Sequence, residues 1–403
     1  MFFERVIGIA SGIFLGIITG LTPGLHMNTV SVLIISFSPY LLDYFSPITL
    51  GIIIISMGVT HTFLDTIPSI FLGAPDPDTA LAVLPGHRML LAGKGFEAVK
   101  LTLIGSFFSL IGSILVMPLA IPLIPLLYTL IKPYIGIILI FVMAYMIYLE
   151  NTLRKKITGL ILFLLSGILG YIVLNFPNIN QPLFPLLSGL FGISLLIVSM
   201  SETIIIPKQV ISNSIWMGKR GLVKSISASV ISGSLAGFLP GLGSSQAAII
   251  ALALVRDAGV YTFLVIVGGI NTVNFLFSLA TFYAIDKARN GAIVAMTEII
   301  PKISLDEVIL FMAVALIAGS IATIITLKMT VLFSKLISRI DYRKCCLSII
   351  IFVTASVFYS SSWIGTLILL VSTMVGLIGQ LTGVKKSLLM GCLILPVIIY
   401  FVF

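Results

Sequence analysis

Two ionisable side chains lie close together in an apolar stretch long enough to sit at membrane depth. His61 and Asp65 are four residues apart, which places them on one face of a helix. An ionisable residue inside a membrane span indicates a functional site by default, and a His–Asp pair can relay protons. The alternative is a satisfied buried histidine, with Asp65 capping a turn before Pro68. The residues favour neither interpretation over the other.

Further polar side chains follow two Pro-Gly pairs, Pro23-Gly24 and Pro240-Gly241, which lie 217 positions apart. Each pair is preceded by Gly-x-x-x-Gly within an apolar run. Pro-Gly ends a helix, and the free N–H groups of the next helix form an anion site. The alternative is a plain hairpin turn with small residues that permit close packing. The predicted substrate-binding residues are Gly24, His26, Asn28, Thr29, Gly241, Gly243, Ser244, Ser245, Gln246 and Asn271.

A coupling ion needs its own ligands or proton acceptors. Backbone carbonyls near Thr22 and Leu239, at the two breaks, are suited to Na⁺. Asn271 and Asn274 either face the site or form hydrogen bonds between helices, and Asp76 is either a cation ligand or a loop cap. Na⁺ or H⁺ is the expected coupling ion, and no other metal or cofactor is expected. The predicted ion-coupling residues are Thr22, Leu239, His61, Asp65, Asn274 and Asp76.

The composition predicts an all-α polytopic membrane protein. The chain has 403 residues, of which 59% are hydrophobic and 9% charged, whereas a soluble protein carries about 25% charged residues. The net charge of +9 reflects Lys and Arg in short loops, so nucleic-acid binding does not follow. The three Cys lack zinc-ligand spacing, and no hydrolase, metalloprotease or Walker motif is present. We therefore expect no enzymatic activity.

The duplicated motif divides the chain into two repeats, residues 1–200 and 222–403, joined by a cytoplasmic linker at 201–221. Each repeat is predicted to start with a re-entrant broken-helix hairpin, at 6–40 and 222–256, followed by about five transmembrane helices. The similarity extends further, because Gly58, His61 and Thr62 match Gly268, Asn271 and Thr272 at an offset of 210. Separate interfacial pieces are expected at 119–133 and 328–344.

Loop charges predict how the two repeats are oriented. Five crossings per repeat would invert the second repeat relative to the first. With both termini outside, 18 of the 23 Lys and Arg residues fall in cytoplasmic loops, as the positive-inside rule requires. Matching loops also exchange charge, since Arg154-Lys155-Lys156 corresponds to Ser360-Ser361-Ser362. An inverted repeat in a multi-pass cell-membrane protein is therefore expected.

Several motifs resemble a known family. Leu239-Pro-Gly-Leu-Gly243 after Gly233-x-x-x-Gly237, the loop from Asp76 to Lys94, and Pro185-Leu-Leu-Ser-Gly-Leu-Phe-Gly192 resemble the large membrane subunit of the tripartite tricarboxylate transporters, the TctA type. The first motif departs from the pattern, reading Thr22-Pro-Gly-Leu-His26. The resemblance implies a secondary carboxylate permease coupled to an ion gradient. It also implies an extracytoplasmic binding protein and a small membrane subunit as partners.

The expected function is secondary active transport of a small organic anion, a di- or tricarboxylate, driven by Na⁺ or H⁺. Alternating access around the paired breaks would proceed by an elevator or a rocking motion. The alternative is a translocase for polyprenyl phosphate or another lipid phosphate, because a helix N-terminus holds phosphate as readily as carboxylate. The expected partners are the anion, the bilayer and the two accessory subunits, without nucleic acid. A homodimer is one expected assembly.

Overall fold

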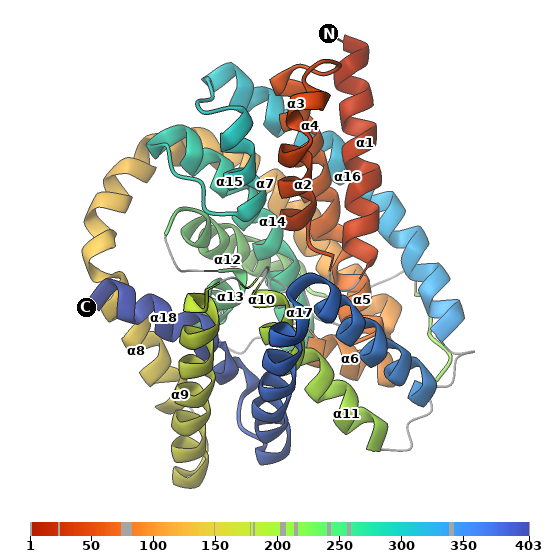
Figure 1. The fold of residues 1–403 in the computed structure, drawn as a ribbon, viewed down its shortest axis with the longest axis vertical. Coiled ribbons are helices and arrows are strands. Elements are labelled where there is room, and N and C mark those ends of the chain that lie inside the picture. Colours follow the sequence, from red (N-terminus) through yellow and green to blue (C-terminus); the bar gives the residue numbers. More distant parts are fainter. Residues whose placement is uncertain are drawn as a thin grey trace.

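The protein is a bundle of helices, and a computed structural model describes most of it (Figure 1). The described part contains helices and no strand. Eight of its helices are long and apolar enough to cross a membrane, which confirms the all-α polytopic class. The residues described are 2–22, 25–73, 83–148, 150–177, 179, 182–201, 207–212, 217–239, 243–255, 259–337 and 342–402.

The helices of the first half begin with two antiparallel legs and continue into long apolar segments. They are α1 (Phe2–Leu21), α2 (Met27–Ser36), α3 (Ser38–Leu41), α4 (Pro47–Leu64), α5 (Thr66–Phe71), α6 (Val83–Leu91), α7 (Gly95–Ile131), η1 (Lys132–Tyr134), α8 (Ile135–Tyr148), α9 (Leu153–Asn175), α10 (Leu183–Leu187), η2 (Ser188–Ile193) and α11 (Ser194–Ser201).

The second half repeats this order with similar lengths. Its helices are α12 (Lys219–Phe238), α13 (Ser244–Val255), α14 (Val260–Ile285), α15 (Gly291–Ile299), α16 (Leu305–Ile337), α17 (Tyr342–Thr382), η3 (Lys386–Met390) and α18 (Gly391–Val402). The counterpart of α1–α2 is α12–α13, α4–α5 corresponds to α14, and α6 and α15 both have nine residues.

Glycines at every fourth position let α1 lie directly against α4. A Cβ at Gly12 would fall 2.5 Å from the carbonyl oxygen of Ile53, and one at Gly16 would fall 2.7 Å from that of Met57. A step of four residues along α1 thus moves the contact four residues in the same direction along α4, so the two helices run parallel. At their starts, the Glu4 carboxylate accepts a hydrogen bond from the backbone N–H of Ser46 at 2.6 Å. Since α4 starts beside the start of α1, the chain returns through α2 and α3 and forms a hairpin.

The second hairpin is held in the same way. A Cβ at Gly233 would fall 2.7 Å from Cβ of Val273, and one at Gly237 would meet Cβ of Phe277. A step of four residues along α12 again moves the contact four residues in the same direction along α14, so these two helices run parallel. The chain therefore runs back through α13 between them. The Thr281 hydroxyl also donates to the Gly237 carbonyl at 3.0 Å, which ties the end of α12 to α14.

The central helices α4 and α14 pair in opposite directions. A Cβ at Gly58 would meet the Phe275 ring, and the Thr62 and Thr272 hydroxyls are 3.2 Å apart. The contact residue on α14 has a lower number at Thr62 than at Gly58, so the two helices run antiparallel. Thr62 and Thr272 are equivalent in the two repeats, at the offset of 210, so they meet at the centre of this pairing.

Two long helices cover the partner half. Gly105 of α7 has no room for a Cβ because the Val265 carbonyl of α14 occupies that position, and Phe311 of α16 packs against Gly51 of α4. Figure 1 shows α7 curving outward along one side. Residues 119–131 continue α7 despite Pro118, Pro122 and Pro125, and 328–337 continue α16. The amphipathic or interfacial pieces expected at 119–133 and 328–344 are therefore continuous with the preceding helices over these residues.

The helix α17 reverses direction at Ser362. This residue has φ 56° and ψ −160°, which is uncommon for a side chain other than glycine. Figure 1 shows α17 rising to the kink and then descending. The kink falls in the Ser360-Ser361-Ser362 segment, which is expected from the sequence to form a loop, so two helices meet there in one merged element.

Candidate substrate and ion site

His61 and Asp65 face the interior from the end of α4. Both side chains are 2% exposed, and Asp65 occupies the single turn residue between α4 and α5. The His61 Nδ1 lies 3.1 Å from the Thr19 hydroxyl of α1. Thr19 itself donates to the Gly16 carbonyl at 3.3 Å. That leaves the Thr19 oxygen as the acceptor, so neutral His61 carries its proton on Nδ1.

His26 lies beside His61, with ring centroids 5.0 Å apart. It is the N-cap of α2, and its Nδ1 accepts the backbone N–H of Asn28 at 3.1 Å. Neutral His26 therefore carries its proton on Nε2, the opposite tautomer from His61. The cap also uses one of the N–H groups expected for substrate at the start of α2. The two imidazole rings therefore contact each other between the end of α4 and the start of α2.

Asp65 connects the two central helices. The Asn271 side-chain amide of α14 donates to Asp65 Oδ2 at 2.7 Å, and Asn271 is also 2% exposed. Asp65 makes no side-chain cap bond to α5, so the capping alternative does not describe it. Asp65 is thus a buried carboxylate that accepts a hydrogen bond from an amide of the other half. A change in its protonation state would therefore alter the contact between the two halves.

Asn274 extends this contact to the second hairpin. It lies one turn from Asn271 on α14, and its amide donates to the Ser244 hydroxyl at the start of α13 at 3.1 Å. Ser244 is 2% exposed. The polar groups therefore form one string from Ser244 through Asn274, Asn271, Asp65 and His61 to His26. This string joins the first turns of α13 and α2.

The remaining predicted residues are only partly described. Gly24, Gly241 and Asp76 lie outside the described residues, as do the side chains of Thr29, Ser245 and Gln246. Gly243 precedes α13, and its carbonyl accepts the Ala247 N–H at 3.1 Å. Asn28 follows the His26 cap, and its Oδ1 is buried with no hydrogen-bond partner among the described residues.

The two backbone positions expected to hold Na⁺ differ in their surroundings. The Thr22 carbonyl accepts the Leu25 N–H at 3.2 Å, so one of its lone pairs is used. Leu239 is buried and has extended backbone at the end of α12, which turns its carbonyl out of the helix. Across the part of the chain that the structure describes, no group of three or more His, Cys, Asp or Glu side chains has metal-binding geometry.

Sequence reasoning missed two residues in this neighbourhood. Thr19 lies in the first repeat motif, but its counterpart at the offset of 217 is Ala236, so the duplication does not mark it. Arg289 lies in the short segment between α14 and α15 and belongs to no repeated motif. His87 on α6 is also buried, at 3% exposed, and its Nδ1 lies 3.0 Å from the Ile70 carbonyl.

Comparison with known proteins gives two matches. The family model described as "Tripartite tricarboxylate transporter TctA family" matches residues 6–391. A protein of Methanocaldococcus jannaschii, "Uncharacterized protein MJ1079", is 32% identical over 400 residues, which cover 97% of each chain. No solved structure matches the sequence. The family match spans nearly the whole chain and both helix breaks, so this chain belongs to the tripartite tricarboxylate transporter TctA family of membrane transporters.

Proposed function

We propose that this chain is a secondary active transporter that moves a di- or tricarboxylate across the cell membrane, driven by an H⁺ or Na⁺ gradient. The observation that carries the proposal is the polar string between the two hairpins. It places the first turns of α2 and α13 at opposite ends of a contact made by Asp65 and Asn271. An anion held by either turn is thereby linked to a buried carboxylate.

The coupling step follows from the charges. A carboxylate substrate and an ionised Asp65 repel each other in a medium of low dielectric constant. A proton on Asp65, or a cation at the Leu239 carbonyl, removes or offsets that repulsion. Binding of the ion and the anion therefore become mutually favourable, and this reciprocity is what couples two fluxes. His26 and His61 supply a route for protons to this position.

The antiparallel pairing of α4 and α14 supports an inverted repeat. Equivalent helices of the two repeats run in opposite directions where Thr62 meets Thr272. Under an inverted repeat, moving one hairpin relative to the other exposes the site first to one side of the membrane and then to the other. The topology with both termini outside and the Lys/Arg-rich loops inside completes this proposal.

The family system includes a binding protein and a small membrane subunit, and we propose that this chain works with both. The binding protein would deliver the anion to the outer side. The family description names tricarboxylates, which favours carboxylate over the lipid-phosphate alternative.

The test is uptake by purified protein in liposomes. Labelled citrate or succinate is offered with an inward H⁺ gradient, an inward Na⁺ gradient or neither. We expect accumulation with one gradient and a rise in melting temperature with the same anion. A parallel assay with polyprenyl phosphate distinguishes a carboxylate transporter from a lipid-phosphate translocase. Absence of both gradient-driven uptake and any thermal shift with carboxylates would contradict the proposal.

A further inference from the structure

Arg289 lies between α14 and α15, and part of its guanidinium group is enclosed by protein. Its Nε and Nη2 atoms are buried, and neither has a hydrogen-bond partner among the described residues. A guanidinium group stays charged at any physiological pH and can only donate. Buried charged donors without an acceptor are rare because their desolvation is not compensated. These two nitrogens therefore indicate that an acceptor with negative charge binds there.

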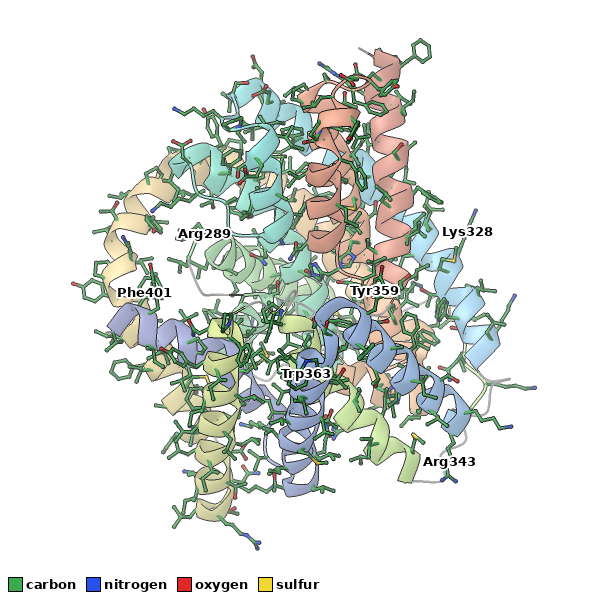
Figure 2. The ribbon with its side chains drawn as sticks, in the orientation of Figure 1. Arg289, Lys328, Arg343, Tyr359, Trp363 and Phe401 are labelled. Carbon is green, nitrogen blue, oxygen red and sulfur yellow. The ribbon has the colours of Figure 1, made fainter. Side chains whose placement is uncertain are left out.

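The arginine is held in place by an aromatic ring. Its guanidinium carbon lies 5.3 Å from the centroid of Tyr128 on α7, within the range of a cation–π contact. Lys287 shares the ring at 5.0 Å. Figure 2 shows Arg289 beside α12 and below α15, on the inner side of the curved α7. Tyr128 therefore holds the guanidinium group in place, while its Nε and Nη2 atoms have no acceptor among the described residues.

The segment that carries Arg289 is anchored to both halves of the candidate site. The backbone N–H groups of Arg289 and Asn290 donate to the Ser278 hydroxyl at 2.9 and 2.7 Å. Ser278 lies one turn beyond Asn274 on α14. On the other side, a Cβ at Gly291 would fall 2.7 Å from Cγ of Asn28, so this backbone lies against α2. Arg289 is thus positioned between the start of the first hairpin's return helix and α14.

We propose that Arg289 binds a carboxylate group of the transported anion and selects substrates with more than one carboxylate. The inference rests on the proposed function and adds a binding residue to it. The N–H bonds of Nε and Nη2 point toward the same edge of the planar guanidinium group. This pair can form two parallel hydrogen bonds with the two oxygens of one carboxylate. A carboxylate held at a helix break and a second one held at Arg289 distinguish a polycarboxylate from acetate.

The experiment measures binding of citrate, succinate and acetate to purified protein by calorimetry. Arg289→Gln should raise the Kd for citrate about 10- to 100-fold, the loss expected for a charge-assisted bond. Arg289→Lys keeps the charge but cannot form the two parallel hydrogen bonds of a guanidinium group. Its Kd for citrate should therefore fall between those of Arg289→Gln and the wild type. Acetate affinity should change by less than about threefold in either variant, because a single carboxylate does not span both positions. The matched control is Lys287→Gln, which removes an exposed charge on the same segment and over the same ring.

A structural role for Arg289 predicts a different pattern. If the guanidinium only supports the fold, Arg289→Gln lowers the melting temperature without ligand and weakens all three anions alike. If it binds substrate, the ligand-free melting temperature stays the same or rises, and only the citrate-induced shift is lost. Unchanged citrate affinity in folded Arg289→Gln would overturn this assignment while leaving the proposed function intact. A wild-type protein that binds none of the three anions would overturn both.

Discussion

Asp65 is the residue at which the two halves and the titratable groups meet, and its charge can be removed with little change in shape. In Asp65→Asn, the new amide oxygen can still accept from Asn271, so we expect a stability loss of only about 1 kcal/mol. The variant cannot take up a proton or repel the substrate. Accumulation driven by the gradient should be lost, while exchange of labelled for unlabelled carboxylate continues.

Liposome uptake with and without a gradient, together with counterflow, checks this expectation. Asp306→Asn is the matched control, because Asp306 is exposed in the first turn of α16. Full accumulation by Asp65→Asn would show that its carboxylate takes no part in coupling.

His87 makes the stability of the protein depend on pH. Burial lowers the pKa of His87, while its bond to the Ile70 carbonyl partly opposes this shift. The unfolded chain therefore binds more protons than the folded one near the ordinary pKa of 6.5. This contribution is complete above pH 6.5 and decreases as the pH falls toward the lowered value. Melting temperature should drop between pH 7 and 5, and His87→Gln should flatten that dependence.

The sequence predicted the residues of the candidate site better than it predicted their partners. His61, Asp65, Asn271 and Asn274 were all selected because polar groups are rare in long apolar helices. The Asp65–Asn271 bond joins residues 206 positions apart, although Asn271 is the sequence counterpart of His61 at the offset of 210. The actual partner depends on the crossing of α4 and α14, which side-chain periodicity does not encode.

At the level of helices, close packing of α7 on α14 depends on glycine. A Cβ at Gly105 would collide with the Val265 backbone, which cannot move as a flexible side chain can. Gly105→Ala should therefore destabilise the protein by about 1–3 kcal/mol, the usual cost of overpacking. Thermal unfolding in detergent measures the loss.

Gly221→Ala is the control, because its nearest neighbour is the mobile end of Met217 at 3.6 Å. Alanine is the better helix former there, so that variant should be as stable as the wild type or more so. Equal melting temperatures for both variants would mean that α7 and α14 are less closely packed than described.

Helix starts and breaks were largely predictable, whereas helix continuity was not. Both hairpins and the break near Ser360–Ser362 follow from Pro-Gly pairs and a loss of apolar residues. Pro118, Pro122 and Pro125 lie within α7, yet the helix continues and curves. Prolines three and four residues apart remove donors along the helix, which bends it without ending it.

For the whole molecule, the predicted sidedness of the loops can be tested by labelling. In a background with Cys345, Cys346 and Cys392 replaced by Ser, single cysteines are placed at Tyr44 and at Lys156, which lie in the first half. The predicted topology exposes Tyr44, which is 81% exposed, to the outside and places Lys156 inside. A membrane-impermeant maleimide should label intact cells at Tyr44 only. Equal labelling at both positions would contradict the proposed sidedness.

The exchange of long helices between halves has a consequence for the history of the chain. Because α7 covers α14 and α16 covers α4, neither half covers its own central helix completely. An ancestral polypeptide with a single unit would have needed a second copy inserted upside down in the same bilayer. Under the proposed inverted repeat, fusion of the genes for two oppositely inserted copies would fix this pairing, and the opposite loop charges would set the orientation of each half.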